Sequence, residues 1–463
     1  MTQRILIDPI TRIEGHGKIE IDLDSYGKVS AARFQVPEFR GFEKFCEGRA
    51  AEEMPILTQK ICGVCPIAHH IASTKALDDL FNVSPPLAAI KIRELIYHAF
   101  MFEDHLLHVY YLGGPDWLLG PDVPASQRNI VGLSDRMGKP FTSMMMAARN
   151  KAREIIARIS GSALYPVFGL PGGISKSLST EDRDFALSAS DDMVSFARMS
   201  LNLFDKLLLK RPSMAEMMTD PLYYQPTYYL GMVDDTGRLS FYDGRIRIVD
   251  PDGTIHSTFE ARDFSRHLVE RVEPWTYMKT LALKDPDRGS FSGNEPAGIY
   301  RVGPLARLNV SSGISTPLAH AEYEKMMNYF GKKPVHHTMA YHWARLIEVL
   351  YAAERTAELA RDSNILHSEV RTLPKPLLTE RSGTGACEAP RGTLFHVYQA
   401  TTQAMILKLN LVVATQHNAA AICRSVYQAA SRLISDGQIS EPITNRIEMA
   451  YRAYDPCLAC ATH

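Results

Sequence analysis

Hydrophobic and polar residues alternate near the start of the chain, as in Lys18-Ile19-Glu20-Ile21-Asp22-Leu23. A period of two residues places successive side chains on opposite faces, which is typical of a strand with one buried face. The stretch Ser25-Tyr26-Gly27-Lys28 holds turn-forming residues after this run. The pattern therefore predicts a small antiparallel sheet over residues 4–36.

Most of the remaining chain shows helical periodicity. From Pro85 to about Leu112 no helix breaker interrupts the pattern, and Gly113-Gly114-Pro115 then ends it. Further helices are predicted near residues 141–160, 181–211, 318–331, 337–362 and 417–436. These lengths favour a mostly helical fold built around long central helices.

Two segments depart from the helical pattern. Residues 226–260 predict a strand-rich insertion, with strands at Leu239-Ser240-Phe241-Tyr242 and Arg245-Ile246-Arg247-Ile248-Val249. Residues 364–393 contain repeated proline and glycine and are predicted to be loop-rich. Because no internal repeat or linker divides the chain, we expect one α+β, mostly α domain over residues 1–463. Its small antiparallel sheets should lie at the periphery of the long central helices.

The composition narrows the class of protein. The chain is 45% hydrophobic and 22% charged, as in ordinary globular proteins. A net charge of −1 gives no electrostatic case for binding nucleic acid or an anionic membrane. The start, MTQRILIDPITRIEG, lacks the apolar core of a signal peptide, and no apolar run reaches the roughly 18 residues of a membrane span. We expect a cytoplasmic protein.

Two Cys-x-x-Cys pairs, Cys62-Gly63-Val64-Cys65 and Cys457-Leu458-Ala459-Cys460, carry the strongest chemical signal. Four thiols in such pairs suit nickel, zinc or an iron–sulfur cluster. A structural zinc site is the simplest interpretation of the spacing, but such sites usually gather their ligands locally. These pairs lie almost a whole chain-length apart. We therefore predict a catalytic metal at the centre of the fold, with the C-terminus buried around it.

Several motifs follow one another in a fixed order: Ile13-Glu14-Gly15-His16-Gly17, Arg40-Gly41-Phe42-Glu43, Ile61-Cys62-Gly63-Val64-Cys65, Glu388-Ala389-Pro390-Arg391-Gly392 and Asp455-Pro456-Cys457-Leu458-Ala459-Cys460. Together they resemble the large, catalytic subunit of nickel–iron hydrogenases. Arg452-Ala453-Tyr454 and Ala461-Thr462-His463 resemble its cytoplasmic, multi-subunit, bidirectional branch. The resemblance implies that fold, and reversible heterolytic oxidation of H2 to protons and electrons.

The resemblance also implies a nickel–iron centre. Cys62 and Cys457 would be terminal nickel ligands, while Cys65 and Cys460 would bridge to an iron that carries one carbon monoxide and two cyanides. Cys457 would also receive the proton released from H2. Glu14 would be the next proton acceptor, although an isolated Glu near a strand is more often a capping or salt-bridging carboxylate.

Other positions match the surroundings of that centre. Asp104, Arg391 and Asp455 correspond to a polar canopy above the open metal position, and Pro390 would line it. Taken singly, Asp104 would be a solvated helix residue and Asp455 a turn residue. His69 lies four residues after Cys65, where it could donate a hydrogen bond to that sulfur or be an ordinary core histidine.

A second, hard metal site is implied near the C-terminus. Glu43, His463 and the backbone carbonyl of Leu411 match the ligands of a magnesium ion, completed by waters. The alternative is a surface Glu and a frayed terminus. Leu411, Val413 and Thr415 match the stretch packed around the diatomic ligands of the iron, with Thr415 hydrogen-bonded to a cyanide. The three other cysteines are expected to pack as small hydrophobes: Cys46, Cys387 and Cys423.

These three spare cysteines are too few for an iron–sulfur relay within this chain, since one cubane cluster takes four. Electrons would therefore leave through an obligate iron–sulfur small subunit. Further subunits would pass them to NAD(P) through a flavin module, to ferredoxin, or to a heterodisulfide reductase. Two alternatives remain: a structural zinc protein, and a non-catalytic relative like the quinone-site subunit of respiratory complex I, which lacks the thiols.

Overall fold

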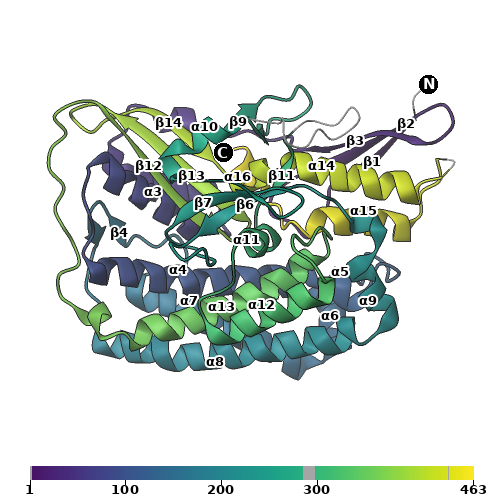
Figure 1. Ribbon diagram of the computed structural model, residues 1–463, viewed down its shortest axis with the longest axis horizontal. Coiled ribbons are helices and arrows are strands. Elements are labelled where there is room, and N and C mark those ends of the chain that lie inside the picture. The colour runs from purple at the N-terminus through teal and green to yellow at the C-terminus, as the bar shows by residue number, and fades with distance from the viewer. Residues whose placement is uncertain (1–2, 285–297, 436) are drawn as a thin grey trace.

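The computed structural model describes residues 3–284, 298–435 and 437–463. A layer of long helices lies beneath several small sheets (Figure 1). The long helices are α4 (Leu87–Leu107), α7 (Lys139–Ser160), α8 (Thr180–Phe204), α12 (Pro317–Phe330) and α13 (Ala340–Arg361). Each lies within a few residues of a predicted helix, so the expected α+β, mostly helical architecture is confirmed.

Helix α13 is buried along nearly its whole length and packs against α4, α8 and α12. A helix buried on every face belongs in the centre of a fold. It also brings charged residues into the core, because Arg345 and Glu348 have no exposed surface. Helix α4 does the same with Asp104 and His105. Buried charges of this kind need partners: Glu348 pairs with Arg307, and Asp104 pairs with Arg391.

Helix α4 ends earlier than predicted, at Leu107, and the chain continues as a π-helical turn over His108–Leu112. Such turns often occur at functional sites. This one places His108 in the buried interior, where its ring faces Asp455.

The predicted N-terminal sheet is present. Its strands β1 (Arg4–Ile7), β2 (Lys18–Leu23) and β3 (Val29–Gln35) are antiparallel in the order β1-β2-β3. Ile19, Ile21 and Leu23 form its buried face, as their alternation predicted. Strand β3 packs against α14 (Ala414–Leu433), which leads toward the C-terminal segment.

The strand-rich segment is also present, with β6 (Tyr228–Val233), β7 (Arg245–Val249) and β8 (Ile255–Phe259). A fourth strand, β11 (Tyr300–Arg301), joins β6 in parallel. The predicted strand over residues 239–242 is wrong, because Leu239 forms only an isolated bridge to Val233. The apolar residues of that stretch are buried in the core rather than in the sheet.

The prediction of a loop-rich segment over residues 364–393 is wrong in its second half. Strands β12 (Arg381–Ala389), β13 (Gly392–Ala400) and β14 (Ile406–Val412) form an antiparallel sheet. The glycines that suggested a loop are needed because β12 packs directly on helix α3 (Pro66–Leu80). A Cβ at Gly385 would lie 2.1 Å from the carbonyl oxygen of Ala72. Glycine inside a strand often marks such a close backbone approach.

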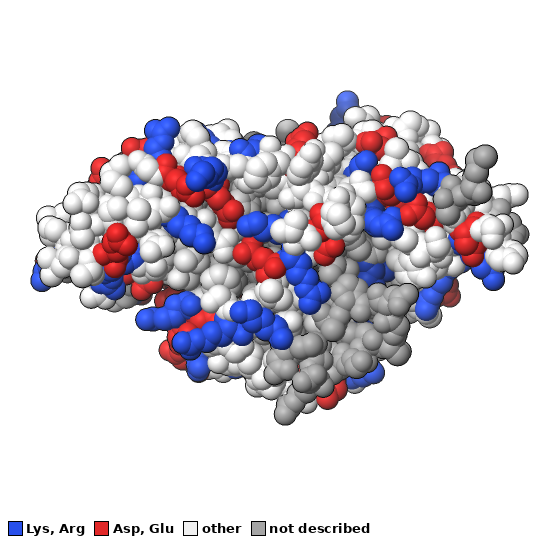
Figure 2. Space-filling model, turned by 90° about the horizontal axis from the view of Figure 1, so that it is seen from above, with Lys and Arg blue, Asp and Glu red and all other residues white. Residues whose placement is uncertain are grey.

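Shorter elements complete the described ranges: α1 (Phe42–Phe45), α2 (Met54–Thr58), β4 (Gly169–Leu170), β5 (Gly173–Ile174), α5 (Gly114–Leu119), α6 (Ile130–Met137), α9 (Pro212–Thr219), α10 (Phe264–His267), β9 (Leu268–Arg271), β10 (Thr280–Leu283), α11 (Pro304–Val310), α15 (Glu441–Arg452) and α16 (Leu458–Ala461). Within those ranges, every helix is too short or too polar to cross a bilayer. On the face shown in Figure 2, basic and acidic residues are interspersed, as the near-zero net charge suggests.

Replacing Gly385 with alanine should destabilise the fold. The added methyl group would press on the α3 backbone, and overpacking of this kind costs about 1–3 kcal/mol. Ser382→Ala is a matched control, because Ser382 lies on the same strand and is exposed. Thermal unfolding of the purified protein should show a lower midpoint for Gly385→Ala alone; equal midpoints for both variants would contradict the packing argument.

Candidate metal centre

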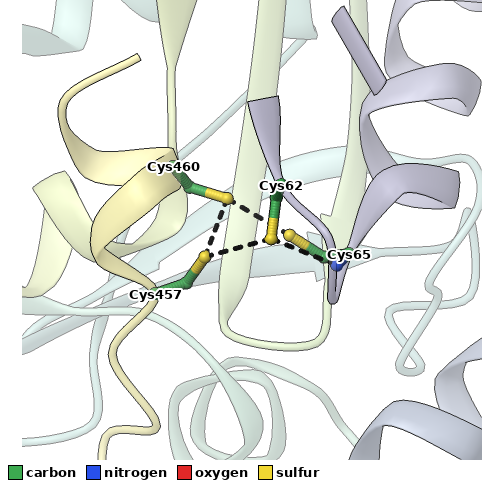
Figure 3. A group of neighbouring side chains, drawn as sticks. All are labelled: Cys62, Cys65, Cys457 and Cys460. Carbon is green, nitrogen blue, oxygen red and sulfur yellow. Dashed lines mark hydrogen bonds between the residues drawn. The ribbon is translucent and has the colours of Figure 1, made fainter. Parts of the chain in front are cut away.

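The two cysteine pairs meet in the interior of the molecule. Sulfur atoms of Cys62, Cys65, Cys457 and Cys460 all lie within 4.8 Å of one another, and all four residues are buried. Figure 3 shows the two pairs pointing toward each other from distant parts of the chain. The shortest separations are 2.9 Å between Cys457 and Cys460 and 3.2 Å between Cys65 and Cys460. In the described ranges this is the one group of three or more Cys, His, Asp or Glu residues whose ligand atoms lie this close together.

Local backbone geometry fixes each pair. Cys65 caps the N-terminus of α3, and Pro66 occupies the first helical position, where its missing N–H costs nothing. The Cys62 sulfur accepts backbone N–H bonds from Val64 at 3.2 Å and from Cys65 at 3.3 Å. Cys457 similarly caps α16, which carries Cys460. The Cys-x-x-Cys spacing thus turns both sulfurs of each pair to one side.

The ionisation of the four thiols shows what this site needs. Burial opposes ionisation of Cys62, but hydrogen bonds from Cys457, Cys460 and Cys65 lower its pKa well below the usual range. The pKa values of Cys457 and Cys460 rise far above it, because of burial and the neighbouring sulfurs. Four thiolates therefore cannot coexist here without a cation, which is the role of a bound metal. The donor set fits a soft metal centre.

Glu14 lies directly against the C-terminal cysteine pair. Its Oε2 accepts hydrogen bonds from the Cys457 thiol at 3.1 Å and from the Ala459 N–H at 3.0 Å. Its carbonyl accepts the Leu458 N–H at 3.0 Å, so the N-terminal segment runs beside the tail. Gly15 permits this approach, since a Cβ there would lie 2.8 Å from that of Leu458. Burial, followed by the charge on Cys62, raises the pKa of Glu14.

The predicted canopy residues also come together. Arg391 lies just before β13 and contacts Asp104 and Asp455, each at 3.2 Å. His108 Nδ1 lies 3.0 Å from the Asp455 carboxylate. Burial raises the pKa of Asp104, against the opposing effect of Arg391. Asp455 is shifted down because Arg391 and His108 outweigh its burial, so its pKa falls below the usual range.

A cavity of about 20 Å³ lies beside the sulfurs, enough for one water-sized group. Its lining joins the cysteines to most of the predicted surroundings: Cys65, Ala68, His69, Ala389, Arg391, Leu394, Val413, Ala414, Thr415, Cys457 and Cys460. Pro390 is the next residue after Ala389 and is itself buried. Thr415 lies in the first turn of α14, and its Oγ1 accepts the Cys457 N–H at 3.0 Å.

His69 contacts a different sulfur from the one predicted. Its Nε2 lies 3.4 Å from the sulfur of Cys460, not of Cys65, and its Nδ1 lies 3.1 Å from His396. One turn into α3, the ring faces across the site to the opposite cysteine pair. His69 therefore lies beside a sulfur, but that sulfur belongs to Cys460 and not to Cys65.

Glu43, Leu411 and His463 form a second cluster. Glu43 Oε1 accepts the Leu411 N–H at 2.9 Å and lies 3.3 Å from His463 Nε2. Lys279 Nζ, which the sequence did not suggest, lies 3.3 Å from Oε2 of the same carboxylate. Burial opposes ionisation of Glu43, but His463, the Leu411 amide and Lys279 lower its pKa to about 2. His463 is buried, so the frayed-terminus alternative is wrong.

Arg40 is a site residue to which the sequence assigned no role. Its guanidinium donates to the carbonyl of Ile61 at 2.5 Å and to the carbonyl of Ala459, which ties the two cysteine segments together. Its position in the Arg40–Glu43 motif was the one feature of the sequence that could have indicated this role. The three remaining cysteines lie outside the four-cysteine group. Cys387 accepts a hydrogen bond from the Tyr97 hydroxyl, and Cys423 accepts one from the Phe34 N–H. Cys46 is fully buried.

The fold and the site define a metalloprotein with a buried four-thiolate centre flanked by a carboxylate and an arginine. A family model described as nickel-dependent hydrogenase matches residues 40–161 and 290–463, and a HoxL-like model matches residues 4–39. The chain is 40% identical over 462 residues to a protein of Archaeoglobus profundus that is named for the iron-sulfur component of an F420-non-reducing hydrogenase. The match covers 100% of this chain and 94% of that protein.

Two further relatives agree. The chain is 37% identical over 478 residues to the beta component of the NAD-reducing hydrogenase HoxS of Cupriavidus necator, covering 100% of this chain and 95% of that one. A crystal structure of NAD+-reducing NiFe hydrogenase in the H2-reduced state superposes with a TM-score of 0.91 at 37% identity, over 100% of both chains. This chain therefore belongs to the nickel-dependent hydrogenase family, where it is a large subunit with oxidoreductase activity. This family assignment excludes the two alternatives, a structural zinc protein and a non-catalytic relative of the complex I subunit.

Loss of one ligand should abolish metal binding. Cys460→Ser replaces a soft sulfur with a hard hydroxyl and should remove nickel from the purified protein, because a thiolate site selects soft metals. Cys46→Ser is the control, since Cys46 is equally buried but lies outside the four-cysteine group. Elemental analysis should find about one nickel per chain in the native protein and the control. Nickel retained at that level in Cys460→Ser would refute the ligand assignment.

Proposed function

We propose that this subunit catalyses the reversible heterolytic oxidation of H2 to protons and electrons at the four-cysteine centre. A nickel–iron centre held by these sulfurs supplies the Lewis acidity and redox chemistry for H–H cleavage. Cys62, Cys65, Cys457 and Cys460 would hold that centre through their four sulfurs. The observation that carries the proposal is the 3.1 Å contact between the Cys457 thiol and the Glu14 carboxylate.

That contact provides a path for a proton. A general base must lie within hydrogen-bond reach of the proton that it accepts, and Glu14 meets this condition at Cys457. The N–H of Ala459 holds the same carboxylate oxygen at 3.0 Å, which fixes the carboxyl group beside the sulfur. Cys457 therefore holds the proton first and Glu14 receives it next.

Arg391 presents a fixed cation to the reacting atoms. Its guanidinium lines the cavity together with Cys65, Cys457 and Cys460. Asp104 and Asp455 hold it from two sides, so little reorganisation is needed as charge changes during the reaction. Pro390 restricts the backbone just before it. This arrangement supports a catalytic role for the canopy residues Asp104, Arg391 and Asp455.

The residues that line this cavity would surround the small ligands of an iron in the centre. Val413 contributes apolar surface to the lining, and Leu411 lies two residues before Val413, on β14. Thr415 already accepts the Cys457 N–H through its oxygen, which leaves its own O–H to donate to a cyanide. His69 stands on the other side, against Cys460. These groups support an iron with one carbon monoxide and two cyanides.

Magnesium is proposed at the cluster of Glu43, Leu411 and His463. A carboxylate, a backbone carbonyl and water suit this hard ion. The low pKa of Glu43 keeps that carboxylate ionised, which supports cation binding. The Lys279 ammonium contacts the same carboxylate and would compete with the ion.

The chain needs other subunits to carry electrons away. Four of its seven cysteines form the metal site, and the other three are too few for a cubane iron–sulfur cluster, so such a cluster would lie in another subunit. We propose that the first partner is an iron–sulfur small subunit, followed by a flavin and NAD(P) module, a ferredoxin or a heterodisulfide reductase. A relative named NAD-reducing supports the NAD(P) module among these acceptors. A cytoplasmic location and a single domain belong to the same proposal.

Glu14→Gln should separate a proton role from a structural one. Glutamine keeps the size of the side chain but has no exchangeable carboxylic proton. The variant should contain normal nickel and normal infrared bands of carbon monoxide and cyanide. Its H2-dependent dye reduction should fall by about 100-fold or more, the scale expected for a lost acid or base.

Glu38→Gln makes the same change at an exposed carboxylate and should leave turnover unchanged. Proton exchange between H2 and heavy water should fall with dye reduction in Glu14→Gln only. Native turnover per nickel in a fully metallated Glu14→Gln protein would exclude the proton role, while poor assembly with native turnover would assign Glu14 to structure.

The magnesium proposal has its own test. The native protein should contain about one magnesium per chain, and Glu43→Gln should lose it because a neutral amide is a weaker ligand for a hard cation. Glu270→Gln is the control, since Glu270 also contacts Lys279 but lies outside the proposed ligand set. Metal analysis that finds magnesium in Glu43→Gln, or none in the native protein, would contradict the site.

A further inference from the structure

Arg307 is a fully buried arginine that no part of the proposed mechanism uses. It lies on α11, and its guanidinium makes a bidentate pair with Glu348, with contacts of 2.7 and 2.6 Å. It also donates to the Glu388 carboxylate at 2.8 Å. Two remaining contacts go to backbone carbonyls, of Ala389 at 2.8 Å and of Pro390 at 3.1 Å. These carbonyls belong to the two residues immediately before Arg391.

The other end of this network returns to the canopy. Glu348 Oε2 also lies 2.9 Å from His105 Nε2, on helix α4. Residue Asp104, next to His105 on that helix, is one of the two carboxylates that hold Arg391. The contacts therefore form a closed ring from Arg391 through α4, α13 and α11 to the backbone that precedes Arg391. A ring of this kind sets the separation between the Arg391 backbone and Asp104.

Glu388 gains a role from the same geometry. Its Oε1 accepts the Met232 N–H at 2.9 Å and the Thr393 hydroxyl at 2.6 Å, while its Oε2 accepts from Arg307. Glu388 therefore links β12, on which it lies, to β13, to β6 and to Arg307.

We propose that Arg307 is a positioning residue for Arg391, which it holds over the metal site through the carbonyls of Ala389 and Pro390. This inference rests on the proposed role of Arg391 in the reaction. Only arginine fits the position, because five N–H donors in a rigid plane serve two carboxylates and two carbonyls at once. A lysine would keep the charge but could not make all of these contacts.

The first experiment measures the positioning without using activity. Amide hydrogen exchange is followed in the purified, metallated enzyme complex, in peptides that cover residues 386–395. Arg307→Lys should accelerate exchange in these peptides, because the turn loses its external anchor. Arg93→Lys is the matched control: Arg93 is equally buried and contacts Asp78 and the carbonyls of Leu170 and Gly173, none of which belongs to this turn. It should leave these peptides unchanged.

The second experiment tests whether Arg307 acts through Arg391. Turnover per nickel is measured for Arg307→Lys, for Arg391→Lys and for the double variant. Displacement of a catalytic group by about 1 Å can cost roughly 100-fold, so Arg307→Lys should lose between 10- and 100-fold. The double variant should be no slower than Arg391→Lys within about twofold, because residues that act as one unit are not additive. Arg93→Lys combined with Arg391→Lys should instead show multiplied effects.

Two results would overturn the inference: unchanged exchange in residues 386–395 of Arg307→Lys, or losses that multiply in the double variant. Native turnover in Arg391→Lys would be a different result, since it would refute the proposed role of Arg391 in the reaction. In that case the exchange data still decide whether Arg307 holds the turn. If Arg307→Lys does not assemble, His105→Gln weakens the same ring at a neutral member and takes its place in both experiments, with the same expected results.

Discussion

Four sulfur atoms within 4.8 Å of one another, removed from water, are the constraint on which the rest of the structure depends. One of them can ionise at the expense of the others, but all four can do so only around a cation. The protein adds a compensating positive charge at Arg391 and an acidic hydrogen-bond partner at Glu14. Metal binding, proton handling and the charged canopy are therefore parts of one electrostatic problem.

The residues of this centre come from segments far apart in the sequence. The N-terminal segment supplies Glu14, the start of α3 supplies one cysteine pair, α4 supplies Asp104, and the turn before β13 supplies Arg391. A buried carboxylate, Asp116, joins the two chain ends, since it contacts both Arg12 and Arg452. Such buried ion pairs add little stability compared with apolar packing, but they fix the geometry of the segments that they connect.

The sequence predicted the long helices and the N-terminal sheet because their periodicity repeats over many residues. It predicted the cysteine site because two spaced pairs and a set of motifs point to one chemistry. The prediction of a loop was wrong for residues 381–393, because the glycines there allow a strand to pack closely on α3 and do not form turns. The sequence also missed Arg307 and Lys279, because a single basic residue carries no signal of its own and its partners lie far away in the sequence.

The junction between Glu14 and the C-terminal cysteine pair has a consequence for folding. Contacts between residues so distant in sequence carry the largest loop-closure cost, and they form late when a chain folds. A segment that docks last onto a site lacking its cation is also the one held most weakly, because metal binding and folding are coupled. A metal ion therefore reaches the interior most easily just before the C-terminal segment docks. The order of metal entry and docking follows from the chain topology.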